Sequence, residues 1–199
     1  ALAPWPDPAG DVFQTGAWIL RDARPLSDEL LEFLDAGEPP ICFGFGSTRA
    51  AHDLGRVMIE TARALGRRAI VSRGWADLAP LDGGPDCLPI GETNLQALFT
   101  RVAAVVHHGG AGTTTLAALA GAPQVVIPQM YDQHYWARRV REIGIGVAHA
   151  PGAPATESLT RALDEALRSD VADRARSVAV DVRRDGADVA ADRLISEMG

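Results

Sequence analysis

Short apolar runs alternate with stretches of helical periodicity along most of this 199-residue chain. The runs have the length of buried strands, and several are followed directly by Gly or Pro. They lie at residues 41–45, 69–72, 87–90, 103–107, 124–127 and 143–149. Strands that alternate with helices through short connections build a parallel sheet with helices on both faces. The sequence therefore predicts an α/β fold with a doubly wound, Rossmann-like parallel sheet.

Helical patterns occupy the connections between these runs. Apolar residues recur at helical spacing over residues 54–65, and Gly66 ends that pattern. Further helices are predicted at residues 94–99, 113–120 and 133–142. Beyond Pro154 the chain is rich in Ala, Arg and Asp, which favours two or three helices with a solvated acidic face and no strand.

The first residues differ from the rest in composition. Residues 1–10 hold three prolines, which is typical of an extended linker. We therefore expect residues 1–11 to form a linker and residues 12–199 to form one domain. A further short strand is predicted within residues 12–20.

Composition and charge exclude some classes of protein. The formal net charge of −7 leaves no basic surplus for general nucleic-acid binding. No apolar run approaches the ~20 residues that span a bilayer, and no signal peptide is visible. Cys42 and Cys87 lie in apolar runs without metal-ligand spacing. We expect a cytoplasmic protein with reduced, buried cysteines and no transmembrane segment.

The segment from His107 to Thr114, HHGGAGTT, joins a predicted strand to a predicted helix. Glycines at such a junction allow positive φ and close approach of a ligand, and a helix N-terminus attracts anions. One histidine and a hydroxyl of Thr113 or Thr114 add hydrogen-bond partners for a phosphate oxygen. The alternative is a plain turn flanked by packing histidines. We favour a phosphate or diphosphate site.

Two further segments follow predicted strands and contain polar groups. Asp132 and Gln133 come after residues 124–127, and a carboxylate beside a carboxamide suits adjacent sugar hydroxyls. An Asp that caps the next helix explains the pair equally well. After residues 87–90, Glu92 and Asn94 suit either a ribose or the capping of a short helix, with capping slightly favoured.

Residues 44–49, GFGSTR, invite a dinucleotide-binding interpretation, but Arg49 replaces the third glycine of G-x-G-x-x-G and the fingerprint fails. A plain glycine-rich turn and a turn in which Ser47 contacts a phosphate both remain open. The sequence contains no Ser-His-Asp spacing, Walker A motif or metal-ligand cluster.

Two motifs together resemble the donor-binding half of GT-B nucleotide-sugar glycosyltransferases. They are HHGGAGTT at 107–114 and AGAPQVVIPQMYDQ, which ends at Gln133. The likeness is greatest to bacterial enzymes that glycosylate glycopeptide, macrolide and similar natural products, and to sterol glucosyltransferases. The resemblance spans residues 12 to the last helix. It implies the C-terminal half of a GT-B architecture, with residues 1–11 as the linker from an N-terminal domain.

The resemblance also assigns roles to residues. The diphosphate-contacting histidine of the family corresponds to His108, and the loop and helix contacts that follow correspond to Gly110, Ala111, Gly112 and Thr113. The serine near the diphosphate corresponds to Ser47. The acidic-amide pair that holds the sugar hydroxyls corresponds to Asp132 and Gln133. Plant relatives stack a tryptophan on the base where this chain has Ile90, so base and ribose contacts are expected at Ile90 and Gly91.

The implied reaction is inverting transfer of a sugar from a UDP- or TDP-sugar to a hydroxyl of a small-molecule acceptor. The resemblance implies no metal and no cofactor besides the donor substrate. It places the acceptor pocket and the catalytic base in the N-terminal domain. Two alternatives are half of a sugar-nucleotide epimerase and a non-catalytic nucleotide-sugar binding module.

Overall fold

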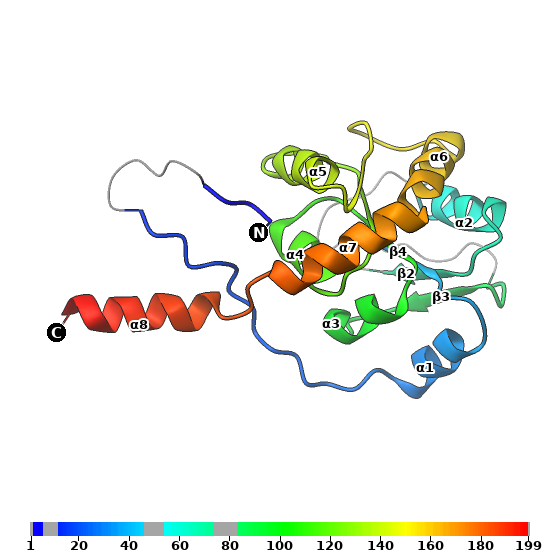
Figure 1. Ribbon diagram of the computed structural model, residues 1–199. Helices are drawn as coiled ribbons and strands as arrows, with labels where there is room; N and C mark the ends of the chain where they lie inside the picture. The colour runs from blue at the N-terminus through cyan, green and yellow to red at the C-terminus, as the bar shows by residue number, and fades with distance from the viewer. Residues whose placement is uncertain (1, 6–11, 46–53, 74–82, 199) are drawn as a thin grey trace.

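The computed structural model describes residues 2–5, 12–45, 54–73 and 83–198 (Figure 1). Its centre is a six-stranded sheet in the order β3-β2-β1-β4-β5-β6, and all neighbouring strands run parallel. The strands are β1 (Ile41–Gly44), β2 (Ala69–Ser72), β3 (Cys87–Ile90), β4 (Ala104–His107), β5 (Gln124–Val126) and β6 (Gly146–Ala148). Each strand lies within the range predicted for it, and the doubly wound α/β prediction is confirmed.

Helices cover both faces of this sheet. They are α1 (Asp28–Asp35), α2 (Leu54–Ala64), α3 (Leu95–Leu98), the 3-10 turn η1 (Phe99–Arg101), α4 (Ala111–Leu119), α5 (Gln133–Glu142), α6 (Thr156–Ala166), α7 (Ser169–Asp181) and α8 (Gly186–Met198). Because side chains alternate along a strand, Ile41 and Phe43 pack with α2 and α6, whereas Cys42 packs on the other face with α1 and α4. The core therefore consists of two apolar layers separated by the sheet.

The order of the strands determines where a ligand can bind. The chain runs from β1 outward to β2 and β3, and then crosses back to β4 on the other side of β1. At that point β1 and β4 end side by side, with Gly44 paired to His107. In open parallel sheets, ligands bind at the carboxyl ends of the strands where the strand order reverses. The junction after His107 lies at this position.

One prediction for the N-terminal quarter is wrong, and one helix there was missed. Residues 12–20 form an extended segment and not a strand. Side-chain contacts hold the segment: Gln96 Nε2 donates to the Leu20 carbonyl at 2.8 Å, and the Arg193 guanidinium lies 4.5 Å from the centre of the Phe13 ring. Helix α1 was not predicted, although Ser27 caps it by accepting from the Leu30 amide at 3.4 Å.

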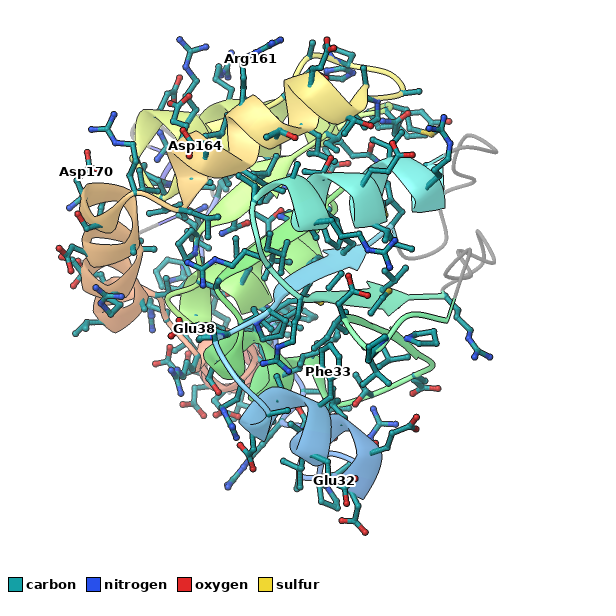
Figure 2. The ribbon with its side chains drawn as sticks, turned by 90° about the vertical axis from the view of Figure 1, so that its right-hand side faces the viewer. Glu32, Phe33, Glu38, Arg161, Asp164 and Asp170 are labelled. Carbon is teal, nitrogen blue, oxygen red and sulfur yellow. The ribbon has the colours of Figure 1, made fainter. Side chains whose placement is uncertain are left out.

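The outer helices carry charged residues on their exposed faces, as predicted. Figure 2 shows Arg161 and Asp164 on α6 and Asp170 on α7 pointing away from the sheet, and all three are exposed. Helix α8 extends away from the other helices in Figure 1, and its Leu194 and Ile195 are exposed. Among the described helices, none is long and apolar enough to cross a membrane.

Candidate functional site

The N-terminus of α4 points out of the carboxyl edge of the sheet beside the end of β4. Gly110 stands at the N-cap position with an extended backbone (φ −63°, ψ 140°), and no side chain caps the helix. The first amide of this turn with a helical acceptor is that of Thr114, which donates to the Gly110 carbonyl at 3.0 Å. The amides of residues 111–113 precede it and have no acceptor within the helix. Three backbone donors and the positive end of the helix dipole therefore lie together.

The threonines of α4 differ in what their hydroxyls do. Thr114 Oγ1 donates to the Gly110 carbonyl at 2.9 Å, and Thr115 Oγ1 donates to the Ala111 carbonyl at 2.8 Å. The hydroxyl of Thr113 makes no hydrogen bond to the described part of the chain and is half-buried. Of the two hydroxyls that the sequence left as candidates, only that of Thr113 is therefore available to a ligand.

His107 is a structural residue. It is fully buried, its Nδ1 accepts a hydrogen bond from the Gly109 amide at 3.0 Å, and its Nε2 donates to Gln124 Oε1 at 2.9 Å. Because Nδ1 accepts, the ring is neutral with its proton on Nε2. Burial lowers the pKa of His107 to about 4, against the opposing effect of the Gln124 hydrogen bond. This ring is inaccessible to a ligand.

His108 differs from its neighbour in both burial and bonding. Its ring is half-buried and covers the backbone of Gly110, where an added Cβ would lie 2.7 Å from His108 Nε2. Its Nδ1 is buried and has no hydrogen-bond partner among the described residues. Burial lowers the pKa of His108, and the negative charge of Asp132 partly offsets that shift. A buried polar atom without a hydrogen-bond partner is uncommon in folded proteins.

Gln133 holds the loop between β5 and α5. It is buried, and its Oε1 accepts from the amides of Gln129 at 2.8 Å and Met130 at 3.1 Å. Tyr131, inside this loop, has a positive φ of 52°. Because the side-chain oxygen of Gln133 is fully used, only its amide nitrogen remains to donate to a ligand.

Asp132 stands at the N-cap position of α5, yet its carboxylate does not cap the helix. The carboxylate accepts instead from Trp136 Nε1 at 3.1 Å and is exposed. The helix-cap alternative for this residue is therefore wrong. The loop that ends in Asp132 lies against the loop after β4, since a Cβ on Gly109 would lie 3.1 Å from the Gln133 carbonyl oxygen.

Ile90 and Gly91 lie at the same edge of the sheet, but at the end of the outermost strand, β3. Strands β2 and β1 separate them from β4. They line a cavity of about 310 Å³ together with Arg24 and Glu92, whose side chains form an ion pair at 2.9 Å. The structure thus brings His108, the start of α4 and the Asp132–Gln133 pair together, and keeps Ile90 and Gly91 apart from them. Ser47 lies outside the described residues.

Asn94 caps the next helix, as the favoured alternative predicted. Its Oδ1 accepts from the Ala97 amide at 3.0 Å, while its Nδ2 donates to the carbonyls of Arg24 at 2.7 Å and Asp22 at 3.1 Å. The side chain therefore joins α3 to the extended N-terminal segment, and its polar atoms are occupied.

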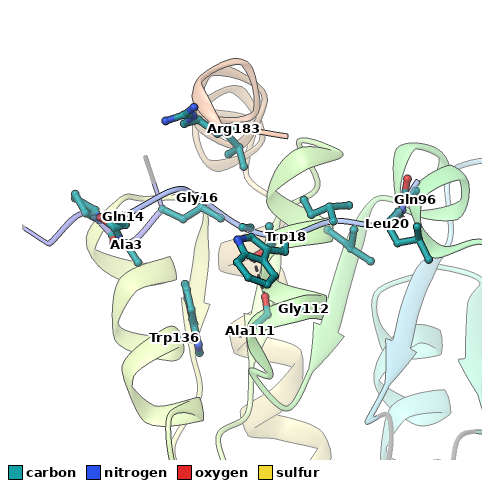
Figure 3. A pocket seen from close by; sticks show the side chains of 17 residues that line it. Ala3, Gln14, Gly16, Trp18, Leu20, Gln96, Ala111, Gly112, Trp136 and Arg183 are labelled. Atoms are coloured by element: carbon teal, nitrogen blue, oxygen red, sulfur yellow. Dashed lines mark hydrogen bonds between the residues drawn. The ribbon is translucent and has the colours of Figure 1, made fainter. Parts of the chain in front are cut away.

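A larger cavity of about 580 Å³ lies beside the first turn of α4 (Figure 3). Its lining includes Ala111 and Gly112 from α4, Trp136 from α5, and Trp18 from the extended segment. Sequence reasoning missed Trp18 because residues 14–20 have no periodicity that would place them against α4. The described residues contain no group of three or more His, Cys, Asp or Glu side chains that could hold a metal ion.

Comparison with known proteins identifies relatives of this chain. Residues 81–192 match the family model described as "Erythromycin biosynthesis protein CIII-like, C-terminal domain". The chain is 58% identical over 194 residues to the vancomycin aglycone glucosyltransferase of Amycolatopsis orientalis, covering 98% of this chain and 48% of that protein. It is 52% identical over 171 residues to the dTDP-epi-vancosaminyltransferase of the same organism, covering 83% of this chain and 43% of that protein.

Solved structures share the fold of this chain. The glycosyltransferase SnogD from Streptomyces nogalater superposes with a TM-score of 0.63 at 25% identity, over 92% of this chain and 50% of that one. The glycosyltransferase of kitacinnamycin superposes with a TM-score of 0.69 at 22% identity, over 92% of this chain and 48% of that one. The chain spans about half the length of the curated relatives it matches. It belongs to the family of the erythromycin biosynthesis protein CIII-like C-terminal domain.

Proposed function

We propose that this chain is the donor-binding half of an inverting glycosyltransferase of antibiotic biosynthesis. The observation that carries the proposal is the set of free donors at the strand-order reversal: the α4 amides, the Thr113 hydroxyl and His108 lie next to Asp132 and Gln133. That set suits a diphosphate joined to a sugar. The names of two relatives, a vancomycin aglycone glucosyltransferase and a dTDP-epi-vancosaminyltransferase, support this function and do not favour an epimerase or a non-catalytic module.

The chemistry assigned to this half is stabilisation of the leaving group. A base on the other half takes the proton of the acceptor hydroxyl, whose oxygen bonds to the anomeric carbon. The bond from that carbon to the diphosphate oxygen breaks on the opposite face, and the electron pair leaves with the nucleoside diphosphate. Negative charge then grows on the diphosphate, where the α4 amides, Thr113 and His108 donate hydrogen bonds. Donors already fixed in the fold need no rearrangement at that moment.

The two ends of the donor are assigned to different strands. We place the sugar at Asp132 and Gln133 after β5, and the base and ribose at Ile90 and Gly91 after β3. The diphosphate then lies between them at the end of β4, with Ser47, which follows β1 in the sequence, as a further contact. The dTDP-sugar in the name of one relative supports a pyrimidine nucleotide as the donor. The acceptor is proposed to bind through an N-terminal domain.

Titration calorimetry with UDP, TDP and UDP-glucose tests the proposal directly. We expect the chain to bind at least one of them. His108→Ala should weaken binding of the bare nucleotide about 10- to 100-fold, because a hydrogen bond to a charged group contributes about 1.5–3 kcal/mol. His134→Ala, which removes an exposed histidine of α5, is the control and should leave the affinity unchanged. Absence of binding to all three compounds contradicts the proposed function.

Asp132→Ala separates sugar recognition from diphosphate recognition. We expect the affinity for a UDP-sugar to fall about tenfold, since a charge-assisted hydrogen bond to a sugar hydroxyl is lost. The affinity for UDP alone should stay the same or rise slightly, because the removed carboxylate is negative. Glu142→Ala at the other end of α5 is the matched control. An equal loss for both ligands would assign Asp132 a purely structural role.

A further inference from the structure

A buried chain of hydrogen bonds runs behind the candidate diphosphate site. The Gly109 amide donates to His107 Nδ1 at 3.0 Å, and His107 Nε2 donates to Gln124 Oε1 at 2.9 Å. Gln124 Nε2 then donates to the Thr114 carbonyl at 3.3 Å. His107 and Gln124 are both fully buried. The side chains of His107 and Gln124 together connect the loop after β4, strand β5 and the first turns of α4.

The backbone around Gly109 shows what this chain of bonds controls. Gly109 has a φ of +93°, and its amide points back to His107. The hydrogen bond fixes the Gly109 amide, and Gly110, the N-cap residue of α4, follows it directly. The orientation of the Gly109 backbone therefore sets the direction of the free α4 amides. On the other side, the bond from Gln124 to Thr114 holds the first turns of the same helix. His107 itself makes the first of these two attachments, and its hydrogen-bond partner Gln124 makes the second.

We propose that His107 is a positioning residue for diphosphate binding, which orients the loop 108–113 through the Gly109 amide without touching the ligand. This inference rests on the proposed function. The bond requires an acceptor at the Nδ1 position, which only the neutral ring provides. The two histidines of the HHGG motif then have different roles: His107 orients the loop, and His108 contacts the ligand.

Two amide substitutions separate the two bonds of the ring. In His107→Asn, the side-chain oxygen stands near the position of Nδ1 and can accept from the Gly109 amide. In His107→Gln, the amide group reaches the position of Nε2 and can bond Gln124, but no acceptor faces Gly109. We expect the Asn variant to keep its UDP affinity within about threefold of the unsubstituted chain, and the Gln variant to lose at least tenfold.

The readout is the ratio of UDP to UMP affinities, measured by calorimetry on the full 199-residue chain. A misplaced loop lowers affinity for the diphosphate more than for the monophosphate, so the ratio falls in the Gln variant. Leu163→Ala, which truncates a buried side chain of α6, is the control for general destabilisation and should leave the ratio unchanged. Thermal unfolding shows whether each variant is folded.

The outcomes are distinguishable. If the unsubstituted chain binds none of UDP, TDP and UDP-glucose, the proposed function fails, and the inference with it. Two results overturn the inference alone, provided that the unsubstituted chain binds UDP. In the first, the Gln variant keeps the ratio of UDP to UMP affinities. In the second, the Asn variant loses as much UDP affinity as the Gln variant. Should the Gln variant not fold, Gln124→Leu replaces it: a ratio at least threefold lower supports the proposal, and an unchanged ratio contradicts it.

Discussion

Gly109→Ala is expected to lower the free energy of unfolding by about 3 kcal/mol or more and to remove measurable nucleotide binding. A Cβ at this position would lie 2.7 Å from Val126 Cγ1 and 3.1 Å from the Gln133 carbonyl oxygen. The φ of +93° adds backbone strain for any residue with a side chain. Relief of the overlap would move the loop away from β5 and α5, which separates the donors of α4 from Asp132. Urea unfolding and calorimetry with UDP measure the two effects.

Gly66→Ala provides the control for backbone strain alone. Gly66 has a φ of +63°, and nothing lies within 4 Å of an added Cβ, so this substitution should cost only about 1 kcal/mol. The double variant Gly109→Ala/Val126→Ala should show a favourable coupling of about 1 kcal/mol, because the nearest clash is removed. If Gly109→Ala lowers the free energy of unfolding no more than Gly66→Ala does, the packing argument is contradicted.

Gly146→Ala is expected to reduce stability by about 4 kcal/mol or to prevent folding altogether. Gly146 pairs with Gln124 across β5 and β6, and a Cβ there would overlap the Gln124 carbonyl oxygen and lie 2.8 Å from the carbonyl carbon and amide nitrogen of the same residue. These are backbone atoms and cannot rotate away. Relief requires β6 to separate from β5, which also displaces the side chain of Gln124 from His107.

The stability of the Gly146→Ala variant is measured by urea unfolding with a probe of secondary structure. The folded fraction of the variant is titrated with UDP. Gly91→Ala is the control, since nothing lies within 4 Å of its added Cβ, and it should change stability by less than about 0.5 kcal/mol. A change below about 1 kcal/mol for Gly146→Ala would mean that β6 tolerates a side chain at this position.

Strands were the most predictable part of this fold, for a physical reason. Five of them are short runs of mostly buried residues, β6 is half-buried, and the residues around each run break the pattern. Helix α1 escaped prediction although Ser27, two acidic residues and the spacing of Leu30 and Leu34 all indicate it. Residues 12–20 were wrongly predicted as a strand because their contacts come from Gln96 and Arg193, which are distant in sequence.

The sequence indicated which residues lie in the candidate site, but not which of them are buried and bonded within the fold. Two adjacent histidines look alike in the sequence, and only the Gln124 and Gly109 partners show that the first is buried and bonded. Likewise, a helix-capping Asp and a ligand-binding Asp occupy the same sequence position. The hydrogen bond from Trp136, one turn along α5, shows that the Asp132 carboxylate does not cap the helix.

The loop held by Gln133 has a thermodynamic consequence. Because one side-chain oxygen already accepts from the amides of Gln129 and Met130, the turn that carries Tyr131 and Asp132 has its shape before any donor arrives. Ordering a loop upon binding costs conformational entropy, and a preorganised loop avoids that cost. The sugar binding proposed for this edge of the sheet should therefore resemble the docking of rigid surfaces, with little ordering of the backbone.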